Sequence, residues 1–113
     1  VNAHGTGTPM NDVIEAAAIK KALGEDNAKK AYVSSTKSMT GHMLGAAGAI
    51  EALACLFALN EGVIPPTINL KEQDENIDLN CVPNTAVKAD ITLALSNSLG
   101  FGGHNACLAF RKV

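Results

Sequence analysis

The sequence predicts an α/β layered fold, and two observations carry that prediction. Helix-type and strand-type stretches follow one another in the order strand, helix, strand, helix, strand, strand. Polar and glycine-rich loops come directly after the predicted strands, which is where α/β proteins usually carry functional residues. The 113 residues, 47% of them hydrophobic, suffice for one compact domain, and we find no internal repeat or linker.

The first helix is predicted over residues 12–23. Asp12 and Glu15 have the spacing of a capping box, and Gly24 follows the last apolar residue as a stop signal. We expect residues 25–30 to be a charged connection and residues 31–34 to be a short strand. That strand would deliver the loop STKSMTGH, residues 35–42.

Residues 43–59 read MLGAAGAIEALACLFAL and predict a helix buried on nearly every side. A membrane span is the competing interpretation. Seventeen residues are at the short limit for a span, and Gly45 and Gly48 interrupt the stretch. Inserting the central carboxylate of Glu51 would also cost about 2.5–3.5 kcal/mol. We therefore favour a core helix and no membrane.

After Gly62, the prolines at 65 and 66 begin a turn-rich, extended excursion that we expect to wrap the surface through residue 86. Two strands are predicted last, over residues 91–95 and 106–110. The segment between them, SNSLGFGGHN, holds three glycines within four residues, which predicts a tight loop with exposed backbone amides.

Composition excludes several classes of function. A net charge of −2 with scattered basic residues gives no reason to expect nucleic acid or an anionic membrane as partner. Three cysteines without CxxC spacing favour a reducing cytoplasm. Because HGTGTP lies so close to the first residue, we expect the chain to be a piece of a longer one. A zinc site from the three histidines would lack cysteine or carboxylate ligands at suitable spacing.

Three loops carry the residues capable of chemistry, at positions 4–8, 36–42 and 96–105. If they converge, His4, Lys37 and His42 share one pocket. Neutral imidazoles each donate one N–H, and two such donors can hold the oxygen of a developing enolate. A nearby ammonium group disfavours protonation of the histidines and keeps them neutral donors.

Four motifs in series carry a family resemblance: NAHGTGTP, SSTKSMTGHMLGAAGAIEA, PPTINL and SNSLGFGGHNA. With them the chain resembles the C-terminal part of the β-ketoacyl-[acyl-carrier-protein] synthases, type II-like elongating condensing enzymes with the thiolase fold. The resemblance implies that residues 1–113 are the C-terminal domain, a mixed sheet packed between helices. It also implies a decarboxylating Claisen condensation of malonyl-acyl-carrier-protein with an acyl group held on a cysteine, in fatty acid elongation.

The resemblance assigns roles by position. His4 and His42 would hold the malonyl thioester oxygen, and Lys37 would orient and tune that pair. Thr6 and Thr8 would bind the phosphopantetheine arm carried by the substrate, unless they only cap the first helix. Phe101 would gate the acyl pocket and contribute its amide to the oxyanion hole, unless it only fills the core.

A second group of residues would support the site: Asn2, Glu51, Ser96 and Asn97. The resemblance places these four residues near one another, where some relatives hold a monovalent cation, and a buried hydrogen-bond network is the alternative. No other cofactor or metal is implied. The chain departs from the family pattern at Gly7, where serine is frequent, and at His104, where threonine is frequent.

The nucleophilic cysteine belongs to the N-terminal half of such an enzyme, so this chain alone is expected to be unable to complete the reaction. None of Cys55, Cys81 and Cys107 is predicted at a helix start, where its pKa would be lowered. The implied partners are the acyl carrier protein, the N-terminal half of the same enzyme and a second copy in a homodimer.

Two alternatives differ in function. A non-catalytic chain-length-determining subunit of a polyketide synthase would keep the fold and lose the chemistry, whereas His4, Lys37 and His42 are all present. A thiolase-like acyl-CoA enzyme would place a cysteine in the last glycine-rich loop, and here none occurs before Cys107.

Overall fold

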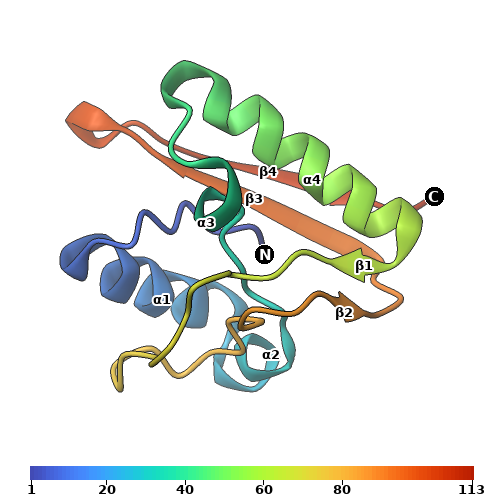
Figure 1. Cartoon of the computed structure of the whole chain (residues 1–113), viewed down its shortest axis with the longest axis horizontal. Helices are drawn as coiled ribbons and strands as arrows, with labels where there is room; N and C mark the ends of the chain where they lie inside the picture. Colours follow the sequence, from blue (N-terminus) through green and yellow to red (C-terminus); the bar gives the residue numbers. More distant parts are fainter.

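The computed structural model describes the whole chain, residues 1–113, as a layered arrangement of helices and strands (Figure 1). The α-helices are α1 (Pro9–Leu23), α2 (Glu25–Lys30), α3 (Lys37–Thr40) and α4 (Ala47–Glu61). Two 3₁₀ turns are η1 (Leu44–Ala46) and η2 (Phe101–Gly103). The strands are β1 (Val63–Ile64), β2 (Val87–Lys88), β3 (Leu93–Leu99) and β4 (Asn105–Arg111).

The first residues of the chain lie between two other extended segments. Asn2 forms parallel bridges to Ser34 on one side and to Ser96 of β3 on the other. The Asn2 N–H donates to the Leu95 carbonyl at 2.7 Å, and the Ala3 N–H donates to the Ser34 carbonyl at 2.8 Å. Three segments far apart in the sequence thus meet side by side, directly before His4, which confirms the α/β prediction.

The last two strands form an antiparallel hairpin with the register Leu93↔Arg111 to Leu99↔Asn105. The strand predicted over residues 91–95 begins two residues later and extends to Leu99. Ser96 and Asn97 therefore lie within β3, beside Asn2, rather than in the loop where the sequence placed them.

Helix α1 begins at Pro9, three residues before the predicted start, because proline is favoured in the first turn, where its missing N–H costs nothing. It ends at Gly24 as predicted. The capping box is wrong: Asp12 accepts a hydrogen bond from the Gly7 N–H at 3.2 Å, and Glu15 is buried below the loop that contains His4.

The charged connection predicted over residues 25–30 is instead helix α2. Its acidic residues occupy the first turn and its lysines the last, so both charge groups complement the helix dipole. The completely buried Ala28 anchors it to a core with Ile19, Val33 and Leu79. The predicted strand 31–34 is extended but forms only isolated bridges, to Asn2 and to Asn80.

Helix α4 packs along β3 and β4 and ends at Gly62, whose left-handed φ of 64° lets its N–H reach the Ala58 carbonyl. The prediction that this helix is buried on nearly every side is wrong. Ala47, Glu51, Cys55, Ala58 and Leu59 are buried, whereas the opposite side is open to solvent. Alanine and leucine occur on every face of this helix, so its periodicity did not indicate which side would be open.

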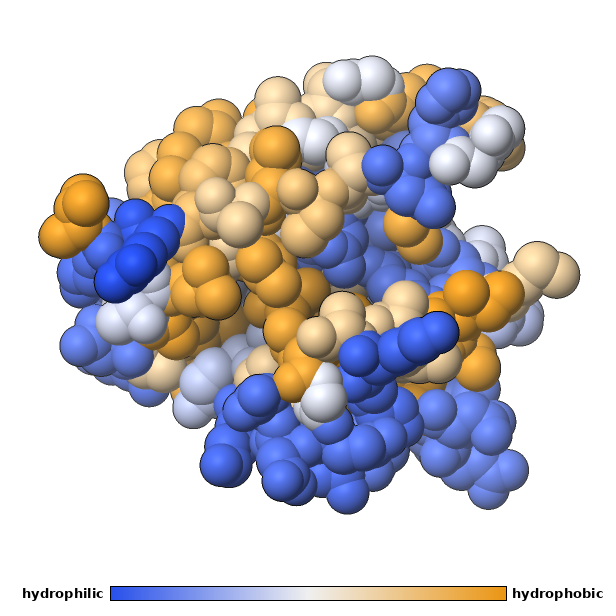
Figure 2. Space-filling model, turned by 180° about the vertical axis from the view of Figure 1, so that it is seen from behind, coloured by the Kyte–Doolittle hydropathy of each residue, from blue (hydrophilic) through white to orange (hydrophobic).

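The open side of α4 carries three large exposed residues: Leu53, Leu56 and Phe57. Leu108 of β4 is exposed as well. In Figure 2 hydrophobic residues cover much of the face that lies behind Figure 1. By length and composition alone, Leu44–Glu61 is also able to span a membrane, a property that it shares with core helices of soluble proteins.

The turn-rich excursion is present as predicted. It is closed at its two ends by the antiparallel pair β1 and β2, in the register Val63↔Lys88 and Ile64↔Val87. Most of it is exposed, but Leu79 and Val82 are buried. One bridge within it, between Thr67 and Pro83, lies next to the segment that precedes α3.

Candidate active site

Two of the three candidate loops converge on a pair of histidines. His4 follows the central extended segment, and His42 follows α3 and Gly41. Their ring centroids are 5.4 Å apart, and the ring planes meet at 86°, an edge-to-face arrangement. His4 is buried and His42 is exposed, so the pair connects the interior to the surface.

The ring of His42 is oriented by backbone. The Leu44 N–H donates to His42 Nδ1 at 3.1 Å, and Leu44 itself has a left-handed φ of 52°. A nitrogen that accepts a hydrogen bond carries no proton, so the neutral ring carries its proton on Nε2. The neutral form of His42 therefore has a fixed tautomer, with its N–H donor at Nε2.

His4 is held in a different way. Its backbone N–H donates to Glu15 Oε1 at 2.8 Å, while its side-chain Nδ1 is buried without a partner. Burial lowers the pKa of His4 below its ordinary value, and the charge of Lys37 lowers it further. Both effects favour the neutral imidazole, as the sequence analysis expected for a donor.

Lys37 begins α3 and is buried, and its ammonium group pairs with the Glu51 carboxylate of α4. Side chains of both partners are at least 95% buried. A lone buried charge would be very costly, so each residue provides the counter-ion of the other. This pairing answers why α4 contains a single acidic residue on its buried face.

Asn2 connects the segment before Lys37 to strand β3 through hydrogen bonds with Thr36 and Asn97. Its amide donates to Thr36 Oγ1 at 3.1 Å and to the Glu51 carbonyl at 3.3 Å, and its carbonyl oxygen accepts from the Thr36 N–H. The Asn97 N–H donates to the backbone carbonyl of Asn2 at 3.0 Å. Asn2, Glu51, Ser96 and Asn97 are therefore neighbours.

Glu15 is the residue that the sequence analysis missed. One oxygen accepts from the His4 N–H and from the Asn97 side chain, and the other accepts from the Gly5 N–H at 2.9 Å. Only 4% of its surface is exposed. Its spacing was informative, because Glu15 lies four residues before the buried Ile19 and hence on the core face of α1.

The remaining candidates lie farther out. Thr6 and Thr8 share a hydroxyl hydrogen bond of 2.9 Å, and Thr8 makes no side-chain cap to α1. Phe101 is at the tip of the β3–β4 hairpin and is fully exposed, so in this chain it does not fill a core. Of the third predicted segment, Asn97 of β3 contacts Asn2 and Glu15 near His4, whereas the glycine-rich tip is exposed.

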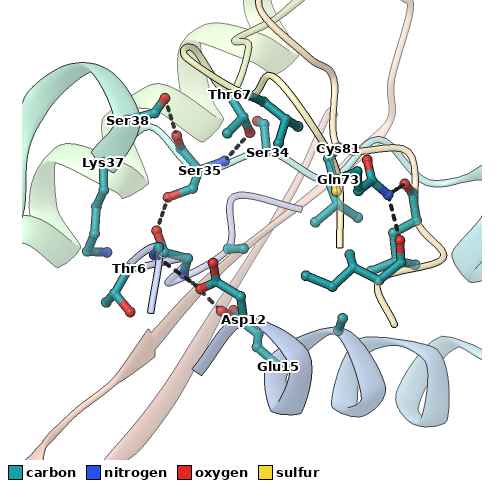
Figure 3. Close-up of a pocket in the computed structure, with 18 of the residues that line it drawn as sticks. Thr6, Asp12, Glu15, Ser34, Ser35, Lys37, Ser38, Thr67, Gln73 and Cys81 are labelled. Atoms are coloured by element: carbon teal, nitrogen blue, oxygen red, sulfur yellow. Dashed lines mark hydrogen bonds between the residues drawn. The ribbon is translucent and has the colours of Figure 1, made fainter. Parts of the chain in front are cut away.

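A cavity of about 530 Å³ opens beside His42 and beside the residues that follow His4 in the chain, Gly5 and Thr6. Thr6, Lys37 and His42 line one end, and Cys81 lies at the other, as Figure 3 shows for the labelled residues Thr6, Lys37 and Cys81. The site therefore has room next to its donors for a small organic group.

None of the three cysteines has the surroundings of a nucleophile. Burial raises the pKa of Cys55 and, together with Asp12, that of Cys81. Cys107 is exposed within β4. No group of three or more His, Cys, Asp or Glu side chains is arranged to hold a metal ion.

Comparison with known proteins gives consistent results. A profile described as the β-ketoacyl synthase C-terminal domain matches residues 1–71. The 3-oxoacyl-[acyl-carrier-protein] synthase 2 of Vibrio harveyi is 53% identical over all 113 residues, which are 27% of its own length. The chain therefore spans about a quarter of this curated relative.

Solved structures of ketosynthases have the same fold as this chain. The ishigamide ketosynthase/chain length factor matches with a TM-score of 0.93 and 45% identity, over 99% of this chain and 27% of that one. A type II PKS acyl-carrier protein in complex with its ketosynthase bound to the hexaketide matches with a TM-score of 0.94 and 40% identity, over the same shares. The fold is thus that of a part, about a quarter, of the thiolase-fold ketosynthases.

Proposed function

The chain belongs to the β-ketoacyl synthase family, and on this premise we propose that it is the C-terminal part of an elongating β-ketoacyl-[acyl-carrier-protein] synthase of fatty acid synthesis. Since it spans 27% of the length of its relative, the activity is that of a longer protein. This part supplies the groups that decarboxylate the malonyl substrate.

The proposed reaction has two steps. In malonyl-acyl-carrier-protein the bond to the free carboxylate breaks, carbon dioxide leaves, and the electron pair moves onto the thioester as an enolate. The enolate carbon then attacks the acyl group held as a thioester on a cysteine, forming a carbon–carbon bond while the cysteine sulfur leaves as thiolate. Groups that bind the enolate oxygen more strongly than the ground-state carbonyl accelerate the first step.

One observation carries this proposal: two imidazoles whose ring centroids are 5.4 Å apart, one of which, His42, lines a cavity and in its neutral form has its donor nitrogen fixed as Nε2. Removing one donor of this type commonly costs about 10²–10³ in rate. His4, whose pKa is lowered by burial and by Lys37, and His42 would each donate one N–H to the enolate oxygen.

Lys37 acts in this proposal through its charge. Its ammonium group opposes the protonation of His4, and its pairing with Glu51 holds it beside the histidines. A protonated histidine would still bind the oxygen, but it could pass its proton to the enolate and quench the carbanion.

The roles of three outer residues are also proposals. Thr6, which lines the cavity, and Thr8, whose hydroxyl shares a hydrogen bond with that of Thr6, would bind the phosphopantetheine arm. Phe101 would gate the acyl pocket from the rest of the longer protein, which is consistent with its complete exposure here.

We propose for Asn2, Glu51, Ser96 and Asn97 that they form a buried network that holds the loops in place, since the hydrogen bonds of Asn2 do so directly. In the alternative with a monovalent cation, the unpartnered buried Glu51 Oε2 would be one of its ligands. Such an ion would add fixed positive charge below the site.

The partners follow from the same proposal. The nucleophilic cysteine would come from the N-terminal half of the same enzyme, and that half would cover the exposed side of α4. The acyl carrier protein would deliver both substrates, and the complete enzyme would be a cytoplasmic homodimer. The similar structure that contains an acyl-carrier protein with its ketosynthase supports the carrier-protein assignment.

The second candidate is a chain-length-determining subunit without catalysis, because one similar structure is a ketosynthase/chain length factor. The converging His4 and His42 and the buried Lys37 pair favour the catalytic alternative. Such a subunit would have no need to keep two imidazoles neutral.

The test uses the full-length protein that carries this chain. His4→Ala should lower the decarboxylation of malonyl-acyl-carrier-protein at least about a hundredfold and leave acyl transfer to the cysteine within about twofold of wild type. His104→Ala is the matched control, since that histidine is exposed at the hairpin loop. Equal loss of both activities in His4→Ala, or no decarboxylation by the wild type, would contradict the proposal.

A further inference from the structure

Ser35 lies between the two histidine-bearing loops and is 8% exposed. Its hydroxyl donates to the Gly5 carbonyl at 2.7 Å. Gly5 directly follows His4, and Ser35 lies two residues before Lys37. This hydrogen bond therefore joins the loop of one proposed oxygen-binding group to the loop of the lysine.

The backbone of Ser35 is held by the beginning of the excursion, the PPTINL motif, which the proposed function leaves without a role. The Ser35 N–H donates to Thr67 Oγ1 at 3.1 Å. The Ser38 hydroxyl donates to the Ser35 carbonyl at 2.8 Å and accepts from the Ile68 N–H at 3.0 Å. Figure 3 shows the hydrogen bonds of Thr67 and Ser38 to Ser35. Each polar group of Ser35 is thus used, and its position is fixed from two sides.

The contact between Ser35 and Gly5 is also tight. Gly5 has a left-handed φ of 42°, and a Cβ added to it would lie 2.5 Å from Ser35 Cβ. On the other side of the same loop, Glu15 accepts from the N–H groups of His4 and Gly5. The peptide units around His4 are therefore held by hydrogen bonds to the Glu15 carboxylate of α1 and to the hydroxyl of Ser35, in the segment before Lys37.

We propose that Ser35 is a positioning residue for decarboxylation: its hydroxyl, supported by Thr67 and Ser38, fixes the Gly5 carbonyl and with it the direction of the His4 ring. This inference rests on the proposed function. It assigns to the PPTINL motif the task of holding the oxygen-binding pair in place from outside the site. Ser35 acts through His4 and does not touch the substrate.

The hydroxyl matters more for the rate than for the fold. The His4 ring has no side-chain partner at Nδ1, so its direction depends on its backbone and on its packing. Without the Ser35 hydroxyl, the Gly5 carbonyl loses its hydrogen-bond donor and the ring loses alignment with the enolate oxygen. One net hydrogen bond corresponds to about a threefold to tenfold change in rate.

The test compares Ser35→Ala with Ser34→Ala in the full-length protein. Ser34 is a matched control, because it is the neighbouring serine, is 5% exposed, and makes hydrogen bonds only through its backbone. Ser35→Ala should lower kcat for malonyl decarboxylation about threefold to tenfold, with KM and acyl transfer to the cysteine unchanged within twofold. Ser35→Thr, which keeps the hydroxyl, should restore most of the rate.

A double-mutant cycle tests whether the effect passes through His4. In a His4→Ala background Ser35→Ala should cause no further loss, because the ring that it aligns is absent. An equal further loss in that background, or equal rates for Ser35→Ala and Ser34→Ala, would overturn the inference.

Two further arms keep the test decisive. Thr67→Val replaces Ser35→Ala if the latter does not fold, because it removes only the acceptor of the Ser35 N–H. We expect the same selective loss of decarboxylation in Thr67→Val. Unchanged decarboxylation in that variant overturns the inference. The proposed function fails separately, if wild type does not decarboxylate malonyl-acyl-carrier-protein or if His4→Ala retains that activity.

Discussion

The buried pair between Lys37 and Glu51 allows a stability prediction with a worked magnitude. Glu51→Gln keeps the volume of the side chain and one hydrogen-bond acceptor, but it removes the charge opposite an ammonium group that is about 95% buried. Breaking a buried pair by neutralising one partner costs about 3–5 kcal/mol. We expect the lower end, about 3 kcal/mol, because Glu51 Oε2 already lacks a partner and the amide still accepts from Lys37.

Urea denaturation of the 113-residue chain measures this cost, at one fixed protein concentration so that association affects all variants equally. Glu61→Gln is the matched control, since Glu61 is exposed at the end of the same helix and its change should stay within about 0.5 kcal/mol. A loss below about 1 kcal/mol for Glu51→Gln would refute the reasoning that the pair is buried and mutually neutralising.

Three further predictions follow from single features. Gly5→Ala should lower the free energy of unfolding by about 3 kcal/mol, because the new Cβ is strained and collides with Ser35. Gly7→Ala is the control: φ at Gly7 is 73° but the space at its Cβ is open, so the loss should be about 1 kcal/mol. Equal losses in calorimetry would speak against the contact with Ser35. Because the pKa of His4 is lowered by folding, the unfolded state takes up a proton at a higher pH than the folded state. The free energy of unfolding should therefore fall as the pH drops below about 6.5, and His4→Gln should make that fall less steep. Denaturation at several pH values measures this, and an unchanged slope in His4→Gln would contradict the prediction. The isolated chain should self-associate through the open side of α4. Phe57, 63% exposed, lies on that side, and Phe57→Lys should weaken association about tenfold or more in sedimentation. A monomeric wild type with a sharp two-state melt would count against this association.

The sequence predicted the fold class and the elements whose ends carry strong signals. Gly24 and Gly62 ended α1 and α4 where expected, because each closes its helix with a backbone N–H to a carbonyl four residues earlier. The missed helix α2 is six charged or small residues long, and only the burial of Ala28 in the core makes it stable. That packing is a tertiary effect that local patterns do not report.

The same limit explains the errors at α4 and Glu15. Alanine-rich and leucine-rich sequence is similar on all faces of a helix, so the periodicity did not reveal that one side of α4 would stay open. Glu15 was assigned to a capping box from its spacing to Asp12, although its place on the buried face of α1 was a better guide.

For the site, sequence motifs identified His4, Lys37 and His42, and the structure brings the two rings together. They did not identify how the groups are held. Three hydrogen bonds hold them, and each uses a backbone atom, which any residue type provides. They join the Leu44 N–H to His42, the His4 N–H to Glu15, and the Ser35 hydroxyl to the Gly5 carbonyl. The proposed roles of Thr6, Thr8 and Phe101 stay predictions, since their partners would lie outside this chain.

We propose above all that His4 and His42 meet as neutral donors. Nitrogen-15 NMR of histidine-labelled full-length protein at pH 7, with each ring assigned from its His→Gln variant, measures the protonation of both rings directly. We expect two neutral imidazoles, with the proton of His42 on Nε2. An imidazolium signal from either ring, or a proton on Nδ1 of His42, would contradict it.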